Sequence, residues 1–153
     1  MSWTSAHDRI VAMVSATEPI TFARGAARKF THDARAAMDA QGRDRSFFVR
    51  LLGVGTLAPF NVGTPGARYK ARCEIVVKYS ADVMSTEQDR IIADDYRVLS
   101  RALLDGSQWD SSTSRIHLIG DGTPMPITAE VDRDNTQGIV LLRVTCPLTF
   151  DDL

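Results

Sequence analysis

The feature that most constrains this chain is a strict alternation of side chains at residues 68–79. One set of positions is apolar or small and consists of Tyr69, Ala71, Cys73, Ile75, Val77 and Tyr79. The other set is mostly charged and consists of Arg68, Lys70, Arg72, Glu74, Val76 and Lys78. Successive side chains of a strand point to opposite faces of a sheet, so this pattern predicts a long amphipathic strand that crosses the domain.

Residues 85–104 predict the principal helix. Ser85 and Gln88 form a capping-box pattern at its start, and Gly106 lies just beyond its end. Asp94 is expected on the solvent side, whereas Asp95 borders the apolar stripe, where it can bond a neighbouring loop. That stripe has helical spacing and consists of Ile91, Ile92, Val98, Leu99, Ala102 and Leu103.

Shorter signals predict the remaining elements. Residues 5–16 and 33–40 read as helices, and residues 20–23 and 28–31 read as a small hairpin. Residues 46–52 predict an internal strand because both of its faces are largely apolar. The last third of the chain is rich in strand patterns, which are expected at residues 115–119, 127–131 and 139–150.

This order of elements predicts an α+β fold, with helices packed on one face of a mostly antiparallel sheet. The late strands are joined by short turns, which antiparallel pairing permits. The chain has 153 residues, about the length of one ordinary domain, so residues 1–153 are expected to form a single domain. Hydrophobic residues make up 44% of the chain, which is enough to build a core of normal size.

The net charge of −1 gives no general attraction to nucleic acid. Residues 1–15 lack the pattern of a signal peptide, and no stretch is apolar enough to span a membrane, so a cytoplasmic protein without a membrane partner is expected. Cys73 and Cys146 lie within apolar, strand-like runs. They are predicted to be buried, reduced thiols.

No catalytic or metal-binding pattern is evident. Gly53, Gly55 and Ala58 spell G-x-G-x-x-A after a strand, but Pro59 follows at once where a dinucleotide site needs a helix to begin. The histidines have no metal-ligand spacing, and no nucleophile elbow is present. The histidines in question are His7, His32 and His117. The chain is therefore predicted not to be an enzyme and to bind no metal or cofactor.

Two parts of the chain are candidates for contact with other molecules. The first is the basic side of the alternating strand, formed by Arg68, Lys70, Arg72 and Lys78 despite Glu74. This side is either a solvated outer face or a face that meets another subunit or DNA phosphates. The second is residues 53–66, whose glycines and prolines predict a long loop that is functional or mobile. The candidate docking residues of this loop are Gly53, Gly55, Phe60, Asn61, Gly63 and Gly66.

The layout of the chain resembles that of the tail terminator (minor tail) proteins of long-tailed bacteriophages and related phage-like particles. The resemblance runs from the first helix and hairpin through strand 46–52 and a loop to the strand RYKARCEIVVKY, helix 89–104 and strand 138–150. It spans nearly the whole chain and rests on the order and size of the elements, without a diagnostic motif. The sequence departs from the family in its longer Gly/Pro loop and in residues 107–114.

The resemblance implies a structural virion protein that forms a hexameric ring at the head-proximal end of the tail tube. The ring would stop tube polymerisation and bind both the tail tube protein and the head–tail connector protein. DNA would pass through its centre without sequence-specific binding. The expected place is the neck region of the virion tail, after assembly in the host cytoplasm, and the family has no catalytic residues to carry over.

A closed ring needs the same head-to-tail interface at every subunit boundary. The basic strand side is then expected to face the lumen or a neighbouring subunit. Two alternatives remain open. One is a head-completion or neck adaptor protein, which shares the size and the ring habit. The other is a small enzyme with an active site in residues 53–66.

Overall fold

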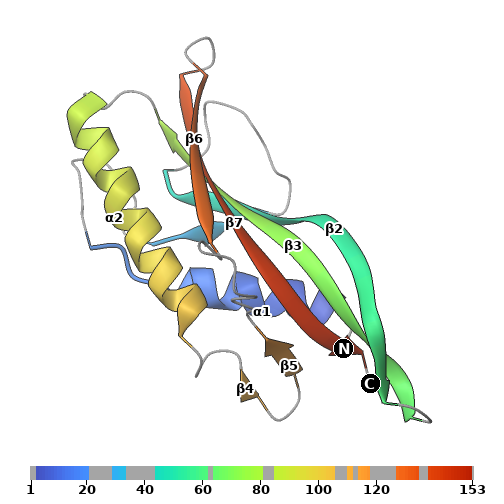
Figure 1. The fold of residues 1–153 in the computed structure, drawn as a ribbon. Coiled ribbons are helices and arrows are strands. Elements are labelled where there is room, and N and C mark those ends of the chain that lie inside the picture. The colour runs from blue at the N-terminus through green and yellow to red at the C-terminus, as the bar shows by residue number, and fades with distance from the viewer. Residues whose placement is uncertain are drawn as a thin grey trace.

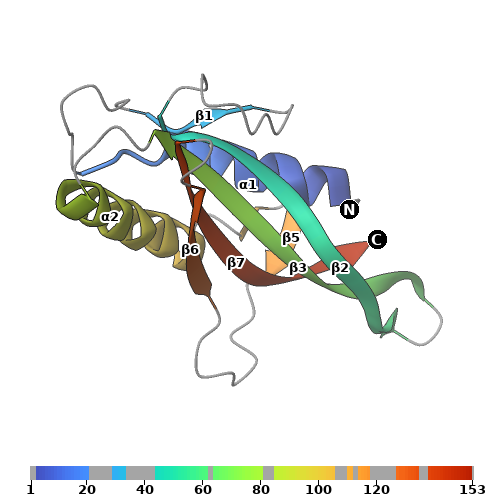
Figure 2. The same ribbon diagram turned by 90° about the horizontal axis from the view of Figure 1, so that it is seen from above.

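The computed structural model describes residues 3–20, 29–33, 44–61, 64–80, 85–105, 110–111, 114–117, 127–134 and 138–152. In chain order these residues form α1 (Trp3–Ala16), β1 (Thr31–His32), β2 (Ser46–Asn61), β3 (Thr64–Ser80), α2 (Ser85–Leu104), β4 (Asp110–Ser111), β5 (Ser114–His117), β6 (Thr128–Asp134) and β7 (Ile139–Asp152). Both helices pack against one side of the sheet (Figures 1 and 2). The predicted α+β fold is therefore confirmed.

The strands of the sheet lie in the order β1-β2-β3-β7-β5-β4, and β6 also pairs with β7. β1 runs parallel to β2, and the other pairs are antiparallel. The β3–β7 ladder is the longest uninterrupted one, from Ala67 opposite Asp152 to Ser80 opposite Ile139. The other edge of β7 is shared by β6, near its start, and β5, near its end. A central pair of long strands thus joins the middle of the chain to its C-terminal part.

The core lies between the sheet and the helices. The alternation predicted at residues 68–79 is confirmed in its direction for the described side chains, because the apolar set from Ala71 to Tyr79 lies in the core on the helix side. The opposite set is less exposed than predicted, since Glu74, Val76 and Lys78 are also buried. The predicted stripe of α2 is also confirmed, since Leu99 and Leu103 are almost fully buried. Burial of each large aliphatic side chain stabilises the fold by roughly 1.5–3 kcal/mol relative to exposure. The other strands and helices add Ile10, Val14, Phe47, Val49, Val140, Leu142, Val144 and Leu148 to the same cluster.

The prediction that residues 53–66 form a long loop is wrong. β2 continues to Asn61, and β3 begins at Thr64, so most of this segment belongs to a hairpin. The pairing of β2 with β3 shifts register between Leu51 and Gly53, between Thr56 and Ala58, and between Pro59 and Asn61. β-Bulges of this kind admit glycine and proline in a strand, especially at a sheet edge. The alternation that identifies a strand is interrupted at each shift, which explains the error.

The prediction that residues 46–52 form an internal strand also needs correction. β2 pairs with β1 at Ser46 and Phe47 alone, so within the described residues the rest of this side of β2 has no neighbouring strand. Leu52 is accordingly exposed. The apolar residues that suggested burial on both faces are instead divided between the core and a smaller cluster on the opposite side of the sheet.

The other predicted elements agree in part. The first helix begins at Trp3 instead of Ser5. The late strands appear as β5, β6 and β7 with shifted bounds. The hairpin at residues 20–23 and 28–31 and the helix at residues 33–40 fall almost wholly outside the described residues.

Cys73 and Cys146 lie directly opposite each other on β3 and β7, with their sulfur atoms 3.1 Å apart. Both are buried and unbridged, which confirms the prediction of buried thiols. The hydrogen bond with Cys73, together with burial, raises the pKa of the Cys146 thiol well above its ordinary value. The thiol therefore stays neutral at physiological pH and is a poor nucleophile.

Candidate interaction surface

The side of the sheet opposite the helices carries the basic residues that the sequence singled out. Figure 1 shows this side, which we call the open face, with α1 behind the sheet. Residues that lie opposite each other in an antiparallel ladder share a face, so the register identifies its members. They include Ser46, Phe48 and Arg50 of β2; Arg72, Glu74, Val76 and Lys78 of β3; Thr128, Glu130 and Asp132 of β6; and Ile139, Leu141, Arg143 and Thr145 of β7.

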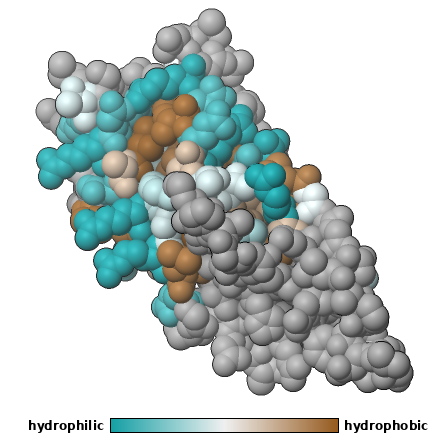
Figure 3. Space-filling view, viewed as in Figure 1, coloured by the Kyte–Doolittle hydropathy of each residue, from teal (hydrophilic) through white to brown (hydrophobic). Residues whose placement is uncertain are grey.

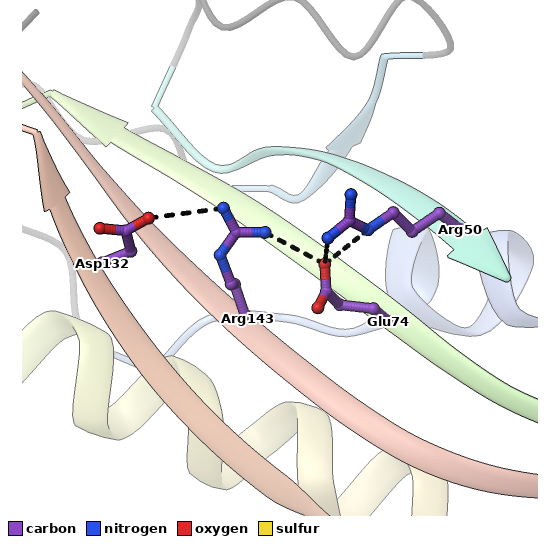
Figure 4. A network of polar contacts seen from close by, with 4 residues as sticks. All are labelled: Arg50, Glu74, Asp132 and Arg143. Carbon is purple, nitrogen blue, oxygen red and sulfur yellow. Dashed lines mark hydrogen bonds and ion pairs between the residues drawn. The ribbon is translucent and has the colours of Figure 1, made fainter. Parts of the chain in front are cut away.

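A network of ion pairs crosses the open face from β2 to β6 (Figure 4). The carboxylate of Glu74 accepts hydrogen bonds from Nε of Arg50 at 2.7 Å and from Nη1 of Arg143 at 3.2 Å. Nη2 of Arg143 also contacts Asp132 at 3.4 Å. The Glu74 side chain is 8% exposed, whereas that of Arg50 is 49% exposed. The network therefore holds four strands together around one buried carboxylate.

Of the residues predicted to make one side of β3 basic despite Glu74, the structure describes the side chains of Arg72 and Lys78. Glu74 is neutralised by two arginines, and Glu130 and Asp132 add exposed negative charge. Lys78 is buried, so it does not belong to an exposed basic patch. Arg72 is exposed as expected. The side chains of Arg68 and Lys70 lie outside the described part of the structure, although their backbones belong to β3.

The open face also contains a small apolar cluster. Val76, Ile139 and Leu141 are buried, and Phe48 packs against them while partly exposed. Figure 3 shows hydrophilic residues around a smaller hydrophobic area on this side of the molecule. The open face is therefore a mixed surface, in which apolar residues lie beside a charged network.

Replacement of Glu74 by Gln is expected to reduce the free energy of unfolding by about 1–3 kcal/mol, because two arginines lose a charged partner in a largely buried position. Urea unfolding would measure the change. The matched control is Glu130→Gln, which alters an exposed carboxylate of the same face and should change stability by less than about 0.5 kcal/mol. Equal effects of the two substitutions would show that the network contributes nothing specific.

A second polar cluster is fully buried on the helix side. Nε and Nη2 of Arg45 donate hydrogen bonds to the two carboxylate oxygens of Asp95 at 2.7 and 2.9 Å. The Tyr79 hydroxyl donates to the same carboxylate at 2.7 Å. The Arg45 guanidinium also lies 5.9 Å from the centre of the Phe30 ring. The prediction that Asp95 reaches a neighbouring segment is thus confirmed, with Arg45 in the turn before β2 as its partner.

The backbone around Arg45 explains why this turn is fixed. Arg45 has φ of 62°, a left-handed conformation that is uncommon for residues other than glycine. Its backbone N–H donates to the carbonyl of Lys78, and its carbonyl accepts from the N–H of Thr31. Asp44 accepts a hydrogen bond from the N–H of Ser80. Side-chain and backbone contacts of this turn therefore join β1, β2, β3 and α2. The sequence predicted the contact of Asp95 with a neighbouring segment but did not identify Arg45 as its partner.

The environment of the cluster shifts two pKa values. Burial raises the pKa of the Asp95 carboxyl, and the hydrogen bonds from Arg45 and Tyr79 oppose that rise. Burial, followed by the nearby Asp95 charge, raises the pKa of Tyr79 well above its ordinary value. The Tyr79 hydroxyl consequently stays protonated in the folded protein at pH values that ionise an exposed tyrosine.

This shift predicts a loss of stability at alkaline pH. Above pH of about 10 the unfolded chain releases the Tyr79 proton and the folded chain retains it, so stability falls as pH rises, by up to about 1.4 kcal/mol per pH unit. Tyr79→Phe should remove this component of the slope while lowering stability at neutral pH. Urea unfolding at several pH values between about 9 and 11 would measure both effects. Parallel pH profiles of the two proteins would contradict the assignment.

The described residues offer no evident catalytic or metal chemistry. The Arg45–Asp95–Tyr79 cluster is closed to substrates, because Arg45 and Asp95 are completely buried. The structure brings His7 and His32 together, with ring centres 6.0 Å apart. Within the described ranges, however, no group of three or more His, Cys, Asp or Glu residues is arranged to hold a metal ion.

A search with the whole sequence finds no matching protein-family model and no similar curated protein. Among the helices described, neither is both long and apolar enough to cross a membrane.

Proposed function

We propose that this chain is a structural virion protein, a tail terminator whose subunits form a ring on the tail tube. The ring would end tube polymerisation and connect the tube to the head connector. The proposal starts from the resemblance in the order of the elements, and the α+β fold is compatible with that resemblance.

The observation that carries the proposal is the long β2–β3 hairpin. These strands have 16 and 17 residues, and the hairpin extends beyond the helices (Figures 1 and 2). Such an arm is a suitable element for contacts between subunits or with the tube. It contains most of the proposed docking residues, namely Gly53, Gly55, Phe60 and Asn61 on β2 and Gly66 on β3; Gly63 lies outside the described residues.

The proposed partners are further copies of this chain, the tail tube protein and the head–tail connector protein. DNA would pass through the ring without sequence-specific recognition. The helix-free open face is the proposed lining of the ring or of a subunit boundary, because the helices cover the other side of the sheet. Arg68, Lys70 and Arg72 remain in this proposal, whereas the buried Lys78 is withdrawn from it.

The assembly state tests the proposal. Native mass spectrometry and negative-stain microscopy of the purified protein, alone and mixed with tail tubes, should show closed rings of about six subunits. A protein that stays monomeric under both conditions would contradict the proposal, and so would one that forms only a two-fold dimer.

A further inference from the structure

Within the described part of the chain, two strands of the sheet have one side without a strand partner. β6 pairs with β7 on one side, and every described side chain from Thr128 to Arg133 is exposed, on both faces of the strand. In the described structure β2 has no strand neighbour on its outer side beyond Phe47. Open edges are sites at which another strand can add, and soluble proteins usually protect them.

The directions of these two strands are compatible with each other. β2, β3, β7 and β6 follow one another through antiparallel pairs, so β2 and β6 run in opposite directions. If β2 of a second copy is placed beside β6, the new ladder is antiparallel. The two sheets then continue each other, with the helices of both copies on the same side. This is a head-to-tail contact, the kind that a ring repeats until it closes.

The charges of the two edges are complementary. On the open face β6 presents Glu130 and Asp132, and β2 presents Arg50, which is 49% exposed although it also bonds Glu74 of its own subunit. Asp132 likewise contacts Arg143 of its own subunit. An antiparallel register that places Arg50 opposite Glu130 also places Val49 opposite Val131. Because β1 occupies this side of β2 at Ser46 and Phe47, the new ladder begins after Phe47. Val131 is a large hydrophobic residue with 43% of its surface exposed. Opposite charges and paired apolar residues both stabilise neighbouring strands.

We infer that copies of this chain join edge to edge, β6 of one subunit pairing with β2 of the next, with Arg50 opposite Glu130. The inference rests on the proposed ring and specifies how its subunits meet. The open face would then be continuous around the assembly, and the helices would lie on the other side of the joined sheets.

Cysteine cross-linking tests this interface. The double variant Arg50→Cys with Glu130→Cys should give a ladder of intermolecular disulfides on mild oxidation, because directly opposite residues lie within disulfide reach. The native Cys73 and Cys146 are buried, so they supply little background. The matched control is Arg72→Cys with Glu130→Cys, which pairs the same β6 position with an exposed residue of the inner strand β3 and should give no ladder.

A second measurement covers the case in which Arg50→Cys weakens the fold by breaking its contact with Glu74. Glu130→Arg places like charges opposite each other at the proposed interface. It should therefore raise the protein concentration at which half of the assembly dissociates by at least about tenfold. Glu87→Arg, the same change on an exposed position of α2, should leave assembly unaltered.

The outcomes separate this interface from the ring itself. If closed rings form but give no cross-linked oligomers and tolerate Glu130→Arg, the proposed interface is wrong and the ring proposal stands. Cross-linked open fibres would support the interface and overturn the ring. A monomer without cross-links would overturn both.

Discussion

Replacement of Asp95 by Asn is expected to lower the free energy of unfolding by about 3–5 kcal/mol, because it leaves a buried cation without its counter-charge. The Arg45 side chain is completely buried, and two of its nitrogen atoms bond the Asp95 carboxylate. Asn keeps the shape of the side chain and removes the charge. Tyr79 also loses its charged acceptor, and the left-handed turn at Arg45 keeps at most one of the two side-chain hydrogen bonds that hold it to α2.

The matched control for Asp95→Asn lies on the same helix. Asp89 forms an ion pair with Arg133 as well, but its side chain is 60% exposed. Asp89→Asn should therefore cost less than about 1 kcal/mol, since exposed ion pairs contribute little. Urea unfolding of both variants would measure the difference. Similar losses in the two variants would mean that the buried cluster is not a specific determinant of stability.

Replacement of Leu103 by Ala is expected to reduce the free energy of unfolding by about 2–5 kcal/mol, because a nearly fully buried leucine leaves a cavity when truncated. Leu103 is 1% exposed and belongs to the main core. The adjacent Leu104 is 56% exposed, so Leu104→Ala makes the same chemical change outside the core.

The two leucine variants share a helix and differ by one position, so helix propensity affects them almost equally. Leu104→Ala should change stability by less than about 0.5 kcal/mol, as expected for a surface substitution. Thermal or urea unfolding would compare them. A large loss in Leu104→Ala with a small loss in Leu103→Ala would contradict the orientation of α2.

The sequence predicted the parts of the fold in which one periodicity continues without interruption. Strand β3 has strict alternation at residues 71–79, and α2 has an apolar stripe between capping signals, so both were recognised. The hairpin end of β2 was missed because register shifts at Gly53, Ala58 and Asn61 break the alternation. Glycine and proline are typical of loops and of bulged edges alike, and only the pairing partner distinguishes the two.

The charge of the open face could not be derived from one strand. The residues of β3 alone suggested a basic surface, but Arg50 and Arg143 lie on β2 and β7 and both bind Glu74. The acidic residues of β6 join the same face through pairing with β7. Arg45 was missed for a different reason. It precedes a strand, belongs to no periodic pattern, and is recognised only from its contact with Asp95, 50 residues later.

Whether this chain ends the growth of a tail tube is tested most directly by the length of the tails. The gene would be removed from the genome that encodes it, and the tails would be measured by electron microscopy. A tail terminator predicts tubes of irregular, excessive length without heads, and the purified protein should restore a uniform length. Tails of normal length that fail to join heads would instead indicate a neck adaptor, and normal infectious particles would contradict a role in the virion.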